Sequence, residues 1–202
     1  IFNISNVLIQ SSVNSFGAIT VAGNTAASNI EGFVYTAMNA VYQTSLSFTS
    51  QNMGARNYRR VDRVLLECLG LVAAVGIVLG QGAYLLGNQL LGIYTSDLEV
   101  ITYGIYRLGI VSTTYFLCGL MDVLAGCIRG LGYSVTPMLV TLVGSCLLRI
   151  VWIFTVFQVM HTQQILYISY PLSWLVTAVT HGICYLVLRR RAFREQPSPE
   201  TT

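Results

Sequence analysis

The feature that most constrains the fold is a succession of apolar segments, each about 20 residues long, with very little charge inside them. A helix needs about this length of apolar sequence to cross a lipid bilayer. Only 9% of the residues are charged and 54% are hydrophobic, whereas a soluble domain carries roughly a quarter charged residues. Too little polar surface is available for a water-soluble fold, so the sequence predicts an all-α integral membrane chain.

We expect six spanning helices that pack as one six-transmembrane-helix bundle within residues 1–190. Their approximate bounds are residues 1–16, 21–50, 64–91, 100–128, 136–160 and 165–188. Residues 191–202 are expected to be a disordered cytoplasmic tail, because EQPSPETT has two prolines and no apolar residue. We expect no signal peptide before Ile1, and we interpret the chain as part of a longer protein.

Arginine placement tests this division independently, because connections that face the cytoplasm are enriched in basic residues. Alternate connections do carry arginine, and the intervening ones, TSDLEV and HTQQ, carry none. One side of the membrane thus receives Arg56, Arg59, Arg60, Arg63, Arg129, Arg189, Arg190, Arg191 and Arg194. The pattern predicts a multi-pass protein with its C-terminus in the cytoplasm. We expect its location to be the plasma membrane.

The sequence lacks the residues that several functional classes require. All eleven basic residues are arginine, so the lysine that a P-loop needs is missing. The five cysteines form no C-x-x-C pair and the two histidines have no metal-ligand spacing. The acids and histidines form no compact constellation, so we expect no enzyme, metal site or resident cofactor, and no nucleic-acid partner.

Asp122 lies inside the fourth predicted span, seven residues before Arg129. A central Asp costs roughly 3 kcal/mol on insertion, whereas each neighbouring Leu or Val returns roughly 0.3 to 0.6 kcal/mol. The helix can therefore cross the membrane if Asp122 faces a cavity. Tyr115, Cys118 and Asp122 share a stripe with Arg129, which suggests a route for a proton or cation; alternatively, Asp122 is a structural partner of Arg149 in the next helix.

The second predicted span carries a polar stripe at steps of three and four residues. Its members are Asn24, Ser28, Glu31, Tyr35, Asn39 and Tyr42. The stripe is either a water-filled path or a buried hydrogen-bond ladder between helices. Glu31 lies about 30 Å from the cytoplasmic loop along a straight helix, so we expect an entrance carboxylate or a side chain that reaches the outer interface. Glu67 and Arg107, near span ends, are interpreted as snorkelling side chains.

Two G-x-x-x-G spacings, Gly76 to Gly80 and Gly126 to Gly130, favour close packing between helices.

Three segments in this order, SFGAITVAGNTAASNIEGFVY, SQNMGARNYRR and LAGCIRGLGYSVTPM, resemble the multidrug and toxic compound extrusion (MATE) family of secondary transporters. The resemblance extends over nearly all of residues 1–190. It implies one lobe of a twelve-helix transporter, spans seven to twelve, which would pair with an N-terminal lobe of the same protein in a membrane of lipids.

What the resemblance implies is export of small organic compounds, often cationic drugs, by alternating access driven by H⁺ or Na⁺. Asp122 matches an acid that the family uses in a cation site, and Glu31 is a second candidate for coupling. The expected substrate path contains Asn24, Ser28, Tyr35, Asn39, Tyr42, Tyr115 and Arg149. Some members also carry an acid in the seventh span, but residues 1–20 have none. That acid lies before Ile1, is replaced by Glu31, or is unnecessary because coupling resides in the first lobe.

Two other functions fit parts of the sequence. A flippase for a lipid-linked precursor would need a strongly basic cavity, for which only Arg149 and Arg107 are available within the spans. A non-transporting membrane scaffold would explain a six-helix chain but would leave the polar second span without a role.

Overall fold

The structure, a computed structural model, describes residues 2–195, with side chains from Val7 to Arg194. This part of the chain is entirely helical and contains no strand, which confirms the all-α prediction. The α-helices are α1 (Phe2–Asn14), α2 (Ala18–Gly54), α3 (Tyr58–Leu85), α4 (Gly87–Gly92), α5 (Leu98–Arg107), α6 (Phe116–Gly130), α7 (Val135–Thr141), α8 (Leu148–Phe154), α9 (Val156–Val159) and α10 (Gln163–Glu195).

Helix starts follow local capping chemistry. The Asn57 side chain accepts a hydrogen bond from the Arg60 amide at the start of α3, at 3.3 Å. Asp97 accepts from the Glu99 amide at the start of α5, at 2.9 Å. Such side chains satisfy amides that have no partner within the helix.

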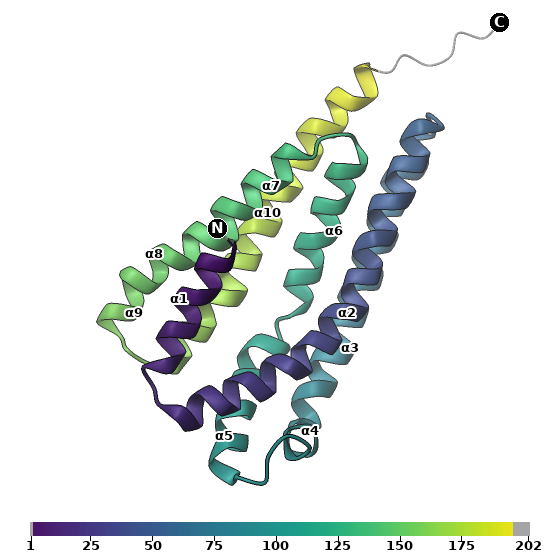
Figure 1. Cartoon of the computed structure of the whole chain (residues 1–202). Coiled ribbons are helices and arrows are strands. Elements are labelled where there is room, and N and C mark those ends of the chain that lie inside the picture. Colours follow the sequence, from purple (N-terminus) through teal and green to yellow (C-terminus); the bar gives the residue numbers. More distant parts are fainter. Residues whose placement is uncertain (1, 196–202) are drawn as a thin grey trace, which may run out of the picture.

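Helix α6 lies at the centre of the fold, against α2, α3 and α10 (Figure 1). Small residues permit the close approach. A Cβ added at Gly126 would lie 2.6 Å from the Ser45 hydroxyl of α2, and one at Gly80 would collide with the Ser112 carbonyl oxygen. The prediction that these glycine spacings serve helix packing is confirmed.

The fourth predicted span is bent rather than straight. A π-helical segment, Leu108–Ser112, follows α5, and the direction changes by 43° before α6 begins at Phe116. A second π-helical segment, Leu142–Leu147, joins α7 to α8. π-Helical turns often mark functional positions within helices.

The helices give partial support to the six predicted crossings. Within residues 2–195, three helical stretches are long and apolar enough to cross a membrane: Tyr58–Leu85, Val135–Val159 and Gln163–Arg194. The bent pair Leu98–Ser112 and Phe116–Gly130 makes a fourth if it is counted as one span. Helices α1 and α2 coincide with the first two predicted spans, but their crossing stays a prediction.

The tail prediction was wrong for residues 191–195, because α10 continues to Glu195. Contacts with α3 hold this end in place. Arg189 donates two hydrogen bonds to the Asp62 carboxylate, and the rings of Phe193 and Tyr58 lie 4.5 Å apart. Arginines in a last helical turn also interact favourably with the helix dipole. Residues 196–202 of the predicted tail lie outside the described residues.

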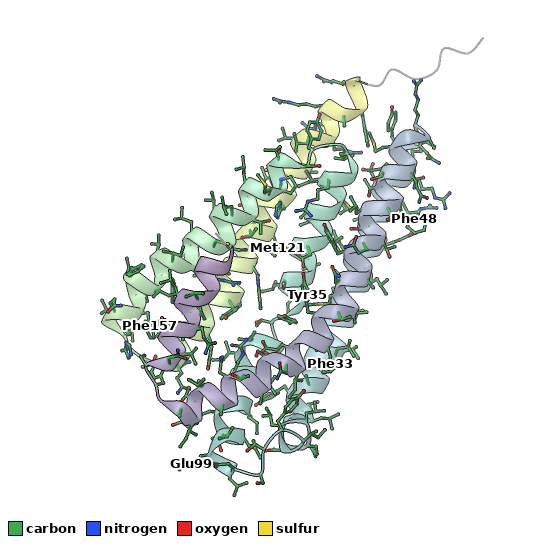
Figure 2. All side chains as sticks on the ribbon, viewed as in Figure 1. Phe33, Tyr35, Phe48, Glu99, Met121 and Phe157 are labelled. Carbon is green, nitrogen blue, oxygen red and sulfur yellow. The ribbon has the colours of Figure 1, made fainter. Side chains whose placement is uncertain are left out.

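The arginine-bearing connections lie together in space. The end of α2, the end of α6 and the end of α10 are at one end of the molecule, whereas α4 and α5 are at the other (Figure 1). Glu99 marks that second end (Figure 2). The fold therefore separates basic and acidic connections as the sequence pattern requires.

Candidate functional site

A cavity of about 350 Å³ lies beside α6, near the middle of the molecule, where Figure 2 labels Tyr35 and Met121. We call it the Asp122 cavity. Its lining residues are Tyr35, Tyr42, Cys118, Met121, Asp122, Ala125, Arg129, Met138, Thr141, Ser145, Arg149 and Trp174. They come from α2, α6, α7, the second π-helical segment, α8 and α10, so the cavity is enclosed by segments far apart in the sequence.

Asp122 is half-buried in this cavity. Among the side chains from Val7 to Arg194, the ion pairs are Arg107 with Glu31 and Arg189 with Asp62. None of the hydrogen bonds in this part of the chain involves the Asp122 carboxylate. A carboxylate removed from water is costly unless a cation or proton balances it, so the Asp122 carboxylate is a candidate to bind one of them in this cavity.

Arg129 lines the same cavity but is bound to α2. Its Nη1 donates a hydrogen bond to the Tyr42 hydroxyl, and its guanidinium lies 5.9 Å from the centroid of the Tyr42 ring. Arg129, the last residue of the ion route predicted along α6, thus connects α6 to α2. Gly126, between Asp122 and Arg129, packs against Tyr42 and Ser45.

Arg149 is buried and is also bound to an uncharged partner. Its Nε donates to the Ser173 hydroxyl at 2.8 Å, and its guanidinium lies 4.4 Å from the Tyr170 ring centroid and 5.7 Å from that of Trp174. The hypothesis that Asp122 pairs with Arg149 was therefore wrong, although the two residues line one cavity. Cation–π contacts satisfy part of the guanidinium's charge. Tyr115 packs edge-on against Trp174, with centroids 5.2 Å apart, outside the lining.

A second polar cluster, the Arg107 cluster, lies among α2, α5 and α10. Arg107 donates from Nε to Glu31 Oε1 at 3.0 Å and from Nη2 to Glu31 Oε2 at 2.6 Å. Its Nη1 donates to Asn24 Oδ1 at 2.5 Å, and the Tyr167 hydroxyl donates to the same oxygen at 3.3 Å. Each side-chain nitrogen and carboxylate oxygen of the pair thus has a hydrogen-bond partner within the protein.

Two interpretations from the sequence change here. Arg107 does not snorkel, because only 6% of its surface is exposed. Glu31, at 3% exposed, neither reaches the outer interface nor stands open as an entrance carboxylate. Both expectations failed because the partner of each charge lies 76 residues away, a distance at which sequence spacing gives no signal.

The polar stripe of α2 divides between the two clusters. Asn24 and Glu31 hold Arg107, whereas Tyr35 and Tyr42 line the Asp122 cavity. The Ser28 hydroxyl donates to the Thr25 carbonyl oxygen within the helix at 2.8 Å. Asn39 is half-buried and lies outside the cavity lining. Asn24 and Glu31 of the stripe therefore belong to a buried hydrogen-bond network, and Tyr35 and Tyr42 belong to the cavity wall.

Sequence reasoning missed Met121, Ala125, Met138, Thr141, Ser145 and Trp174 as lining residues. Trp174 had a signal, since a tryptophan three residues after Pro171 in a span is a rigid aromatic beside a helix-disturbing residue. The others look like ordinary membrane-helix residues. No group of three or more His, Cys, Asp or Glu side chains within the described residues could hold a metal ion.

This arrangement, apolar helices around a broken span with a carboxylate in an inner cavity, is that of a membrane transporter lobe. The MatE family model matches residues 1–155, so the chain belongs to the MATE family of transporters. The resemblance seen in the sequence is thereby confirmed.

Known relatives agree with this assignment. Protein DETOXIFICATION 13 of Arabidopsis thaliana is 32% identical over 102 residues, which are 50% of this chain and 21% of that protein. The Vibrio cholerae MATE transporter VcmN in its bent form has a TM-score of 0.82 at 17% identity, over 94% of this chain and 43% of that one. The MATE transporter ClbM in complex with Rb⁺ has a TM-score of 0.85 at 16% identity, over 96% and 46%.

A MOP superfamily transporter from Pyrococcus furiosus has a TM-score of 0.83 at 18% identity, over 98% of this chain and 45% of that chain. These structural likenesses show the fold: the chain corresponds to one lobe of a MATE transporter. The chain spans less than half the length of each of these relatives.

Proposed function

We propose that this chain is the C-terminal lobe of a secondary active transporter that exports organic compounds by cation-coupled antiport. In this account Asp122 is a ligand of the coupling ion, H⁺ or Na⁺. The observation that carries the proposal is that the Asp122 carboxylate lines the cavity without an ion pair or a hydrogen bond to any described residue, while the guanidiniums of Arg129 and Arg149 are hydrogen-bonded to Tyr42 and Ser173. The carboxylate is thus available to a proton or cation.

Coupling follows from the two charge states of Asp122. A proton or Na⁺ neutralises the carboxylate and allows it to remain in an apolar environment. Once that ion leaves, the bare carboxylate favours any arrangement that brings a guanidinium closer, and two of them line the same cavity. The bound and empty states therefore favour different helix positions, which is the differential binding that a conformational change requires.

The lining also suits an organic substrate. Tyr35, Tyr42 and Trp174 present aromatic rings, and Met121 and Met138 present adaptable thioethers. Aromatic faces attract organic cations, and thioethers adjust to different shapes. The remaining wall of the path would come from an N-terminal lobe of the same protein.

The placement in the membrane is part of the proposal. Nine arginines lie in or beside the helix ends that meet at one end of the molecule, and basic residues that flank spans remain in the cytoplasm. We therefore place the C-terminus in the cytoplasm, and we assign the protein to the plasma membrane as part of the exporter proposal.

The test uses the full-length protein reconstituted in liposomes with an imposed H⁺ or Na⁺ gradient. Asp122→Asn should reduce gradient-driven substrate movement by about tenfold or more, since it removes the charge but keeps the shape. Asp97→Asn is the matched control, because Asp97 caps α5 at an exposed turn and Asn caps equally well. Wild-type export by Asp122→Asn would refute the role of Asp122.

A second candidate, a flippase for an anionic lipid-linked precursor, is favoured by one observation. The Asp122 cavity contains two guanidiniums, Arg129 and Arg149, against one carboxylate. Scrambling of a fluorescent diphosphate lipid that is insensitive to Asp122→Asn but lost in Arg149→Gln would select this function over cation-coupled export.

A further inference from the structure

A second amphipathic recess, separate from the Asp122 cavity, lies on the outer surface of α2 and α3 towards the arginine-bearing end. It has a volume of about 360 Å³, and Figure 2 labels Phe48 on this side of the molecule. We call it the Arg60 groove. Its lining residues are Thr44, Phe48, Arg60, Arg63, Val64, Glu67, Cys68 and Leu71.

The groove has a charged end and an apolar end. Arg60 and Arg63 lie within the first two turns of α3, whereas Leu71 lies eight residues beyond Arg63, about 12 Å deeper along the helix. Phe48 and Leu71 are exposed, at 44% and 53%. Cationic groups above a lipid-facing apolar strip match the shape of one phospholipid, with its phosphate at the interface and an acyl chain below it.

Neither Arg60 nor Arg63 forms an ion pair with a carboxylate of the described residues. The ion pairs among residues 7–194 include neither of them, and the nearest acid in sequence, Asp62, is bound to Arg189. Glu67 lines the groove one turn deeper than Arg63. The groove lining thus has a net charge of +1, which one phosphodiester would balance.

Arg60 and Arg63 lie near the N-terminal end of α3, where a positive charge is unfavourable unless an anion is bound beside it. The N-terminal end of a helix carries a partial positive charge, so cations in the first turns are destabilising and anions are stabilising. The first turn of α3 contains no acid. Enrichment of arginine on the cytoplasmic side explains basic residues at this end, but it does not explain why two of them stand over an apolar groove.

We propose that the Arg60 groove binds one anionic phospholipid of the leaflet that the arginine-bearing end faces. The phosphate would contact Arg60 and Arg63, and an acyl chain would lie against Phe48 and Leu71. Basic recesses between membrane helices bind anionic headgroups in this way. The inference is independent of the transported substrate and of the role of Asp122.

The experiment compares two double variants of the full-length protein, purified in detergent and analysed by native mass spectrometry with added phosphatidylglycerol. Arg60→Gln with Arg63→Gln removes the groove charges. Arg190→Gln with Arg191→Gln removes two equally exposed arginines at the same end of the molecule, outside the groove. Monodisperse elution of both variants verifies that they are folded.

We expect the groove variant to lose phosphatidylglycerol affinity by roughly tenfold, while the α10 variant retains the wild-type value. Equal losses in both variants would show general electrostatic attraction and overturn the proposal, as would no loss in either. Soluble glycerophosphoglycerol, which is the headgroup without acyl chains, serves as a competitor that tests whether the acyl chains contribute to binding. It should not displace the bound lipid, and displacement at matched concentration would overturn the acyl-chain contribution.

Discussion

Arg107 donates to both carboxylate oxygens of Glu31 inside the helix bundle, at 3.0 and 2.6 Å, and thereby connects α5 to α2. Arg107 directly precedes the π-helical segment Leu108–Ser112, at which the fourth predicted span bends. Since Asn24 and Tyr167 complete the same cluster, three distant parts of the chain meet at this guanidinium. We interpret the pair as a structural connection rather than as part of the coupling site.

Glu31→Gln should therefore destabilise the protein. It leaves Arg107 buried without a counter-charge, and removing one partner of a buried ion pair costs roughly 3–5 kcal/mol. The apparent Tm of the purified full-length protein should fall by about 6 °C or more, whereas Glu99→Gln, at an exposed turn, should leave it unchanged. The double variant Glu31→Leu, Arg107→Met should recover most of the loss. Unchanged Tm together with lost ion coupling in Glu31→Gln would instead assign Glu31 to the cation site.

Glycine at position 80 is required by backbone contact. A Cβ there would collide with the Ser112 carbonyl oxygen, whereas a Cβ at Gly82 meets nothing within 4 Å. We expect Gly80→Ala to reduce the free energy of unfolding by about 1–3 kcal/mol. Gly82→Ala, on the same helix, should be neutral or stabilise by up to about 1 kcal/mol. Thermal unfolding in detergent measures both, and equal effects would contradict the packing argument.

Tyr42 is expected to control the availability of Arg129. Without the Tyr42 hydroxyl, the guanidinium is free to approach Asp122 and compete with the coupling cation. One hydrogen bond of about 1 kcal/mol corresponds to roughly a fivefold change, so Tyr42→Phe should raise the half-saturating cation concentration about fivefold. Tyr35→Phe is the matched control, because Tyr35 lines the same cavity and the hydrogen bonds of the described residues do not include its hydroxyl. Equal half-saturation in both variants would contradict this role of Tyr42.

The membrane class and the helical fold could be predicted from the sequence, because insertion into lipid depends on local composition. Low charge, long apolar runs and alternating arginines are each visible without any tertiary contact. Asp122 and Arg149 could be identified as cavity candidates for the same reason: a charge within an apolar helix cannot face lipid. The structure places both in one cavity.

The partners of those charges could not be predicted, because pairing depends on how helices pack. Arg149 had an obvious candidate partner in the preceding predicted span, Asp122, yet it binds Ser173 of α10. Arg107 resembled an interfacial residue because it lies only nine residues after Leu98, the first residue of α5. A comparison of how far each charge lies from the start of its helix would have helped to predict the pairing of Glu31 with Arg107. Glu31 lies thirteen residues after the start of α2 at the same end of the molecule, so the two lone charges are at similar depths.

The central claim is that Asp122 binds the coupling cation, and equilibrium binding to the full-length protein tests it most directly. Binding of radioactive Na⁺ would be measured alongside substrate-induced H⁺ release in weakly buffered detergent solution. We predict that wild-type protein and Asp97→Asn show the same cation binding or H⁺ release, and that folded Asp122→Asn loses that signal. Retention of the wild-type signal by Asp122→Asn would contradict the account.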